Sequence, residues 1–326
     1  MRRWILIFGI LAFLAVPFSA NAVNIYDDDG TKVNLDGDLQ IQLRRDIGVN
    51  EDPYFDYDDL EVAFSATHDL QYNLSAFGML KMDWKKDAHG DGGSPVDEAY
   101  AGLKYEGLDS VKLSGHAGRL DWGSDDFQVE QAYEIEGPFI FPDDGGEESV
   151  RFDINGGIIN VALSGDIEEK ADNATNPNND SVAEAYIYSK YKGLNIGLIA
   201  QTYKKNEDAD SVKTYGARLT YNFEYFDVGA DYSTRDGNGQ DYNDIDHNVN
   251  FVAVIPVPKV EGTEVAAGYG LKSPDEGDDI NTWYANITHN FDSNVSIFAE
   301  VGDNDVKNSQ GKETDIGYLA GLRFQF

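Results

Sequence analysis

Apolar and polar residues alternate with a period of two along most of this chain. The stretch 316–326 shows the pattern clearly, because every second residue is apolar while Arg323 and Gln325 lie on the opposite face. Successive side chains of a β-strand point to opposite faces, so the alternation predicts strands with one apolar and one polar face. A slip of one residue would exchange the two faces, and the register is therefore strongly specified.

The alternation recurs about sixteen times, an even number as in single-chain bacterial barrels, and no segment of helical period competes with it. The runs at 99–105 and 183–190 fit the pattern less cleanly than the others. We expect strands at 33–44, 60–66, 72–76, 99–105, 111–113, 150–154, 159–163, 183–190, 194–200, 215–223, 226–232, 249–255, 265–271, 283–287, 295–301 and 316–326.

The connections between these runs alternate between short and long. Tight joins such as 191–193 and 290–293 alternate with long acidic loops such as 85–96 and 121–148. Short periplasmic turns and long outer loops are typical of an outer-membrane barrel, and aromatic residues near the strand ends suit its interfacial girdles. We therefore predict an all-β fold, a transmembrane antiparallel β-barrel of about sixteen strands.

The first 22 residues have the layout of a cleavable secretory signal: two arginines, an apolar run and small residues at Ala20 and Ala22. We place the cut after Ala22, so that residues 23–326 form the barrel domain. An uncleaved anchor is disfavoured because the apolar run is short and is followed by Pro17. This signal predicts export, and together with the barrel pattern it predicts location in an outer membrane.

Charge narrows the possible partners. The chain has 25 basic and 59 acidic residues, and removing Arg2 and Arg3 leaves 23 − 59 = −36. Such a field repels nucleic acid, which we exclude as a partner. There is no cysteine, the five histidines lack zinc-site spacing, and no nucleophile elbow or phosphate loop is present. We expect no catalytic residues, metal site or cofactor.

Five segments, in this order along the chain, carry a resemblance to the general diffusion porins of Gram-negative bacteria. They are "VNIYDDDGTKVNLDGDLQIQLRRD", "LEVAFSATHDLQYNLSAFGMLKMDW", "DEAYAGLKYEGLDSVKLSGHAGRLDW", "ESVRFDINGGIINVALSGDIEEK" and the terminal phenylalanine. The resemblance implies a homotrimer of sixteen-stranded barrels through which small hydrophilic solutes diffuse passively. It also implies a third loop folded into each pore, a trimer contact at 85–96, and Phe326 as part of the signal read by the barrel assembly machinery.

The third loop would be roughly 121–148, the longest connection, and it contains no Lys or Arg. A ring of carboxylates at a narrow point of a water-filled pore concentrates cations and excludes anions. The alternative is a solvated acidic loop on the outer surface. Our candidate constriction residues in this loop are Asp125, Asp126, Glu130, Glu134 and Glu136.

The same resemblance implies basic side chains on the wall opposite the loop. Arg151 matches such a position on the polar face of its strand, and Arg44 has the same parity. Arg119 also matches a family arginine, but its parity places it on the lipid side unless a β-bulge intervenes. His116 is then the rival lumen residue, and the sequence leaves the two open.

Glu61 and Lys81 depart from the family pattern, which often has an arginine and an acidic residue at these places. Both have lumen parity, and pairing around the turn at 69–71 brings them near each other. They form either a cross-strand ion pair or two independent lumen charges. Either arrangement makes the wall less basic and favours cation preference.

Two other functions remain as alternatives. A solute-specific channel for sugars would be expected to show aromatic residues along the pore, whereas most aromatics here have lipid-side parity. An outer-membrane barrel enzyme would need a nucleophile and a base close together at the rim, and no motif in the sequence identifies such a pair. The acidic outer loops also predict divalent-cation bridges to anionic lipopolysaccharide.

Overall fold

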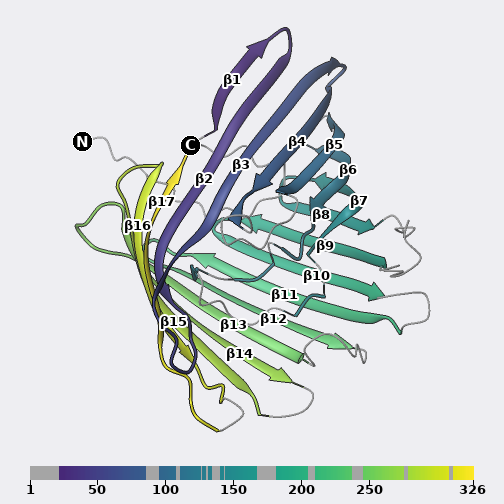
Figure 1. The fold of residues 1–326 in the computed structure, drawn as a ribbon. Helices are drawn as coiled ribbons and strands as arrows, with labels where there is room; N and C mark the ends of the chain where they lie inside the picture. The colour runs from purple at the N-terminus through teal and green to yellow at the C-terminus, as the bar shows by residue number, and fades with distance from the viewer. Residues whose placement is uncertain are drawn as a thin grey trace.

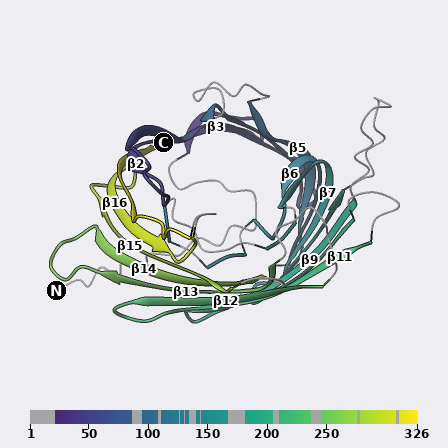
Figure 2. The same ribbon diagram turned by 60° about the horizontal axis from the view of Figure 1, so that its bottom comes forward.

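The computed structural model describes residues 22–85, 95–107, 111–125, 127–129, 131–133, 140–142, 144–166, 181–204, 210–236, 245–274, 278–307 and 311–326. The chain forms one antiparallel sheet that closes on itself (Figures 1 and 2). Sixteen strands, β2 to β17, make the ring, each pairing with the next and β17 pairing with β2. The predicted fold class is confirmed.

A strand overlaps each of the ranges expected from the alternation, including the two that fitted less cleanly, and β1 is an additional strand. Their bounds are β1 (Val23–Asp28), β2 (Thr31–Arg45), β3 (Tyr54–Gln71), β4 (Leu74–Asp83), β5 (Val96–Glu106), β6 (Lys112–Asp121), β7 (Gly145–Asn155), β8 (Ile159–Asp166), β9 (Ser181–Tyr191), β10 (Leu194–Lys204), β11 (Val212–Asn222), β12 (Asp227–Asp236), β13 (Ile245–Pro256), β14 (Thr263–Pro274), β15 (Ile280–Asn290), β16 (Val295–Asn304) and β17 (Gly317–Gln325).

The two faces of the sheet are reversed relative to a soluble protein. Phe152, Leu198 and Phe251 are more than half exposed on the outer face. Gln201 and Ser233 are buried on the inner face. In hydrocarbon every backbone polar group needs an internal partner, which a closed ring of strands provides, and the apolar outer face suits contact with lipid.

The connections confirm the predicted alternation. Short turns join β3 to β4, β5 to β6 and β9 to β10, whereas longer connections join β4 to β5, β6 to β7 and β8 to β9. The turn after β9 needs Gly193, whose φ of 84° is costly for residues with a Cβ. Among the described residues, no helix is long and apolar enough to cross a membrane.

The two end segments of the barrel share one edge of β2. Phe326 and Gly37 exchange backbone hydrogen bonds of 2.8 and 3.0 Å, and β1 then continues along the same edge with Val23 opposite Leu35. The ring of Phe326 lies over Gly37, where an added Cβ would come within 2.2 Å of its Cζ. The backbone groups along this edge of β2 are therefore paired first with β17 and Phe326 and then with β1.

Candidate functional site

A lateral row of carboxylates crosses the inner face of β2 to β6. In the strand register Asp38 is opposite Glu61, Glu61 is opposite Asp83, and Lys81 is opposite Glu98. Residues at the same level of a sheet face are neighbours, so these side chains line one band of the wall. We call this set the acidic row; its members are Asp38, Glu61, Asp83, Asp97, Glu98 and, at the end of β6, Asp121, which interacts electrostatically with Glu98, Asp97 and Lys81.

Two β-bulges add carboxylates to this wall. Near Gln40 the register of β3 shifts, so that Asp58 and Asp59 occupy one site, and both contact inner-face groups. A second shift between β4 and β5 leaves Asp97 beside Glu98. An extra residue in a strand re-aims its side chain, so neighbouring acids that strict alternation would separate lie on the same side.

Two cations bind the acidic row directly. The Lys81 ammonium lies 2.9 Å from Glu61 and 2.9 Å from Asp97, which confirms the cross-strand pair and excludes two independent charges. The Arg323 guanidinium donates to both oxygens of Asp38 at 2.9 and 3.0 Å. The formal charges of the six carboxylates and these two cations sum to 2 − 6 = −4.

Arg44 and Arg151 face inward, as expected, but both are engaged by acids. Arg44 is bound by Asp46 at 2.6 Å and Asp56 at 3.0 Å. Arg151 is buried, donates to Asp153 at 3.1 Å, and holds the Asp121 carbonyl at 2.9 Å. Each arginine is at least matched in charge by its carboxylate neighbours, so neither makes this wall basic.

The prediction of Arg119 as a constriction residue is corrected by the structure. Arg119 is opposite Ala99 and pairs with Glu147 at 2.9 Å, whereas His116 is opposite Gly102 on the face that carries Arg151. A bulge does occur here, but its extra residue lies on β7, and β6 pairs with β5 in unbroken register up to Arg119. Arg119 therefore lies on the outer face, and His116 packs inside against Tyr100 and Phe77.

Several described residues between 122 and 133, after the end of β6, contact the inner wall through their backbone. Glu184 accepts the N–H groups of Gly123 and Ser124 at 2.7 and 3.2 Å. Asp231 accepts that of Val129 at 2.7 Å. The segment thus approaches inner-face groups of β9 and β12.

The contacts continue onto β15 and β16. Glu300 accepts the N–H of Tyr133 at 2.9 Å, and the Tyr284 hydroxyl accepts that of Gln131 at 2.8 Å. The Tyr133 ring stacks on Phe298 with centroids 3.8 Å apart. Burial raises the pKa of the Tyr133 phenol, and its hydroxyl shares a hydrogen bond of 2.7 Å with the Thr288 hydroxyl.

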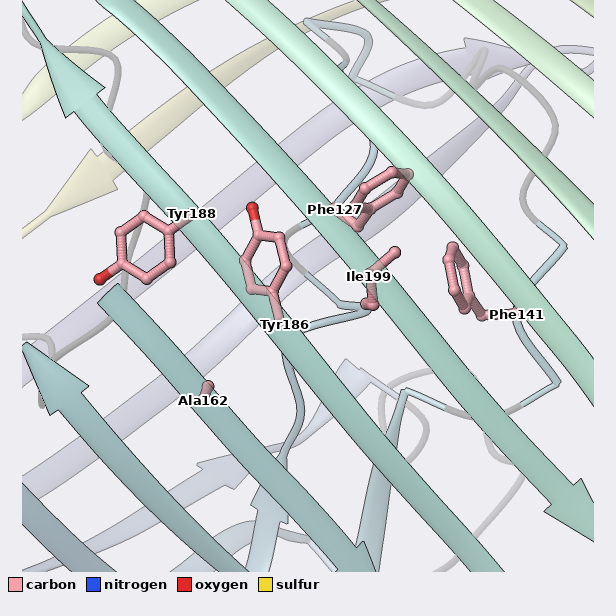
Figure 3. Packing of buried hydrophobic residues seen from close by; sticks show 6 residues of the cluster. All are labelled: Phe127, Phe141, Ala162, Tyr186, Tyr188 and Ile199. Atoms are coloured by element: carbon pink, nitrogen blue, oxygen red, sulfur yellow. The ribbon is translucent and has the colours of Figure 1, made fainter. Parts of the chain in front are cut away.

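Apolar side chains complete this contact. Figure 3 shows Phe127 and Phe141 beside Ile199 and Tyr186, and all four are buried. A Cβ on Gly216 would come within 2.5 Å of the Phe127 ring, so this glycine leaves the space that Phe127 fills. Tyr186 therefore lies on the inner wall and is covered by the segment, whereas many aromatic residues of the strands, such as Phe152 and Phe251, are exposed on the outer face, as expected.

Of the predicted loop acids, only Asp125 is among the described residues, and it is exposed. Asp126, Glu130, Glu134 and Glu136 lie outside them. The sequence analysis missed the three wall carboxylates that accept backbone N–H groups, Glu184, Asp231 and Glu300. The alternation within β9, β12 and β16 places all three on the polar face, and this parity is the feature of the sequence that could have identified them.

The inner wall is polar. The acidic row lies on β2 to β6, and parts of β9 to β16 are covered by the segment that follows β6. Polar groups along a water-filled path can replace part of the hydration of a passing solute, and fixed charges select its sign. The residues described here form no group of His, Asp and Glu suited to holding a metal ion. The polar lining fits passage of hydrophilic solutes along the inner wall.

Comparison with known proteins agrees with this geometry. The sequence model of the Gram-negative porin family matches residues 9–309. Porin-like protein H of Photobacterium profundum is 26% identical over 340 residues, which cover 97% of this chain and 98% of that protein.

Two solved structures share the fold. The trimer form of OmpT, an outer membrane protein of Vibrio cholerae, superposes with a TM-score of 0.70 at 17% identity, covering 91% of this chain and 100% of that one. An anion-selective porin from Comamonas acidovorans superposes with a TM-score of 0.70 at 15% identity and the same coverage. At such low identity these matches show the fold alone.

Proposed function

We propose that this chain, which belongs to the Gram-negative porin family and is an outer-membrane porin, conducts small hydrophilic solutes and ions passively and prefers cations. The acidic row is the observation that carries the preference, with its sum of −4 on β2 to β6. The anion-selective relative has the same fold, so ion preference must come from side chains and not from the barrel itself.

We propose further that residues 121–148 form an inward-folded third loop that narrows the pore. The support is the set of hydrogen bonds from 123–133 to inner-face groups of β9, β12, β15 and β16. A segment held on that side leaves the conducting path beside the acidic row. Asp125, Asp126, Glu130, Glu134 and Glu136 would then add negative charge from the loop.

Planar bilayers with a salt gradient test this function. The reversal potential should have the sign of cation selectivity, and it should decrease when Asp83 and Glu98 are changed to Asn and Gln. Neutralising Asp125, Asp126 and Glu130 together should decrease it as well. Anion selectivity of the unmodified protein would overturn the proposal, and unchanged selectivity in the first variant would remove the acidic row as its cause.

We also propose a homotrimer, supported by the trimeric form of the structural neighbour. The predicted contact at 85–96 lies almost entirely outside the described residues. A high-mass band on a gel that disappears on heating supports the trimer. A monomeric particle that conducts in bilayers would refute it.

The remaining partners follow from the location in the outer membrane. We propose that the barrel assembly machinery recognises Phe326, and that divalent cations bridge acidic loops to lipopolysaccharide. Chelation should loosen the trimer if the bridges exist, and hydrolysis of peptides or phospholipids by pure protein would instead indicate a barrel enzyme.

We also propose that residues 1–22 are removed on export. N-terminal sequencing of the protein from outer membranes should then begin at Val23.

A further inference from the structure

Two cross-strand pairs of threonine and histidine have the same geometry on this barrel. The Thr31 hydroxyl lies 2.7 Å from His68 Nδ1, and the Thr263 hydroxyl lies 2.7 Å from His289 Nδ1. In both pairs the threonine is directly opposite the histidine on the neighbouring strand, β2 beside β3 and β14 beside β15. Neither pair belongs to the pore wall described above.

Both pairs lie on the outer face, near the end of the barrel that carries the short turns. His68 shares the parity of Phe64 and His289 that of Ile287, and these apolar residues are 39% and 47% exposed. Each histidine comes shortly before the end of its strand and the short turn that follows. Short turns are periplasmic in outer-membrane barrels, so both histidines reach the level of the lipid headgroups in the periplasmic leaflet.

The hydrogen bond to threonine fixes each ring through Nδ1 and leaves Nε2 for a group outside the protein. Within the part of the chain that the structure describes, neither Nε2 has a hydrogen-bond partner. A neutral ring that accepts the threonine O–H at Nδ1 carries its hydrogen on Nε2, and an imidazolium donates from both nitrogens. An anion beside the ring favours these forms, so each pair is suited to donate from Nε2 to an anionic oxygen.

Apolar surface continues from each histidine toward the turn. The ring of Phe291 packs edge-on against His289 with centroids 4.8 Å apart, and Phe291 is 60% exposed. Beyond His68, Leu70 and Tyr72 are 40% and 91% exposed. A ligand that fits this surface combines an anionic group with an apolar body.

The carboxylates beside these pairs are occupied by backbone donors. Asp28 is opposite Thr31 and accepts the N–H of the next residue at 3.0 Å. Asp292, in the turn after β15, accepts two backbone N–H groups at 2.8 and 2.9 Å. These donors offset part of each negative charge, so the two acids oppose an anion less than free carboxylates would.

We propose that each Thr–His pair binds the phosphate of a phospholipid in the periplasmic leaflet. Thr31 and Thr263 orient the rings, and Nε2 of His68 and of His289 donates to a phosphate oxygen, while the acyl chains lie along the apolar outer face of the strands. A phospholipid supplies both the anion and the apolar body, whereas free phosphate supplies only the anion. This inference goes beyond the proposed function, because it concerns lipid on the outer face and not solutes in the pore.

Native mass spectrometry of the protein purified from outer membranes, titrated with phosphatidylglycerol, tests the proposal. Diacylglycerol with the same acyl chains is the control lipid, because it lacks phosphate. His68→Leu and His289→Leu, alone and together, remove the donor but keep an apolar side chain on the lipid face. His247→Leu is the matched control: His247 is exposed and shares the outer-face parity of Phe251, but it lies near the start of β13, at the end of the barrel with the long connections.

We expect each single variant to bind one fewer tight phosphatidylglycerol per chain. The double variant should bind this lipid about ten-fold more weakly, the factor for losing a hydrogen bond to a charged group. Diacylglycerol binding should stay the same in all variants, and His247→Leu should match the unmodified protein. Thr31→Val and Thr263→Val keep the histidine but release its ring, so they should weaken phosphatidylglycerol binding by a smaller factor.

Unchanged phosphatidylglycerol binding in the double variant overturns the inference, and so does an equal loss in His247→Leu. An equal loss of diacylglycerol assigns the effect to apolar packing, and displacement of the lipid by inorganic phosphate at equal concentration indicates a free-anion site; both refute a phospholipid site. If the double variant does not assemble, Thr31→Val and Thr263→Val decide, because unchanged affinity in both overturns the inference. Conductance of the unmodified protein tests the proposed function separately from all of these outcomes.

Discussion

Replacing Lys81 with methionine should make the pore more selective for cations. The ammonium of Lys81 lies 2.9 Å from both Glu61 and Asp97, and it is one of two cations that offset the six carboxylates of the acidic row. Methionine keeps much of the length of the side chain but removes its charge. The sum over the row then changes from −4 to −5.

The size of the effect follows from the Coulomb energy of one unit charge. At about 6 Å from a passing ion in water it is ~0.7 kcal/mol, which changes the local ion concentration by about three-fold. The change favours cations and disfavours anions, so the permeability ratio should rise by up to about ten-fold before screening. With a Debye length of about 10 Å at 0.1 M salt the rise should be roughly three- to four-fold, and it should nearly vanish at 1 M.

The assay is the reversal potential across a salt gradient, measured at both low and high salt and at pH 8. Lys32→Met is the matched control, since Lys32 lies in the β1–β2 hairpin, is 59% exposed and pairs with Asp27 at 3.5 Å. An unchanged or lower permeability ratio in Lys81→Met at low salt would refute the reasoning. An equal rise in both variants would show that the acidic row has no special role.

Three further changes have distinct expected outcomes. Arg119→Gln should leave the reversal potential unchanged, because the guanidinium pairs with Glu147 on the outer face; a shift would return Arg119 to the pore. Gly37→Val should lower the yield of heat-resistant barrel on gels, because the new side chain meets the Phe326 ring; a normal yield would show that this contact is dispensable. Extending the chain beyond Phe326 should reduce insertion into the outer membrane much more than the conductance of the molecules that insert, as immunoblots of membrane fractions and bilayer recordings can show.

The sequence predicted the barrel well because lipid and water impose opposite demands on the two faces of each strand. Leu198 and Gln201 have opposite parity in β10, and the structure places them on opposite faces. The same parity, combined with a tight turn, brought Glu61 and Lys81 together. Local rules of this kind act within one strand or one hairpin, which a sequence shows directly.

Features that depend on departures from alternation were not predictable in this way. The bulges at Asp58–Asp59 and Asp97 place extra acids on the inner wall, and a strict period of two hides them. The bulge beside Arg119 was anticipated as a possibility, but its extra residue lies on β7, so Arg119 remains on the outer face. Which strand takes the extra residue depends on the pairing of both strands.

The docking of residues 123–133 was not predictable for a different reason. The acceptors Glu184 and Glu300 are 61 and 167 positions from their donors Gly123 and Tyr133, and the donors are backbone N–H groups that every residue but proline carries. No residue type marks such a contact in the sequence. The sequence predicted a role for the acidic side chains of the loop, whereas the structure shows contacts between its backbone and the acidic side chains of the wall.

The shared edge of β2 has a consequence for the way the protein is made. Asp38 and Arg323, which join β2 to β17, are 285 positions apart, and closing a loop of that length costs about 4 kcal/mol more chain entropy than closing a four-residue turn. The edge of β2 therefore stays open until β17 has been synthesised and delivered. A chain interrupted by a premature stop codon lacks β17 and leaves this edge of β2 without backbone partners, which hydrocarbon does not tolerate, so we expect such a chain not to insert as a pore.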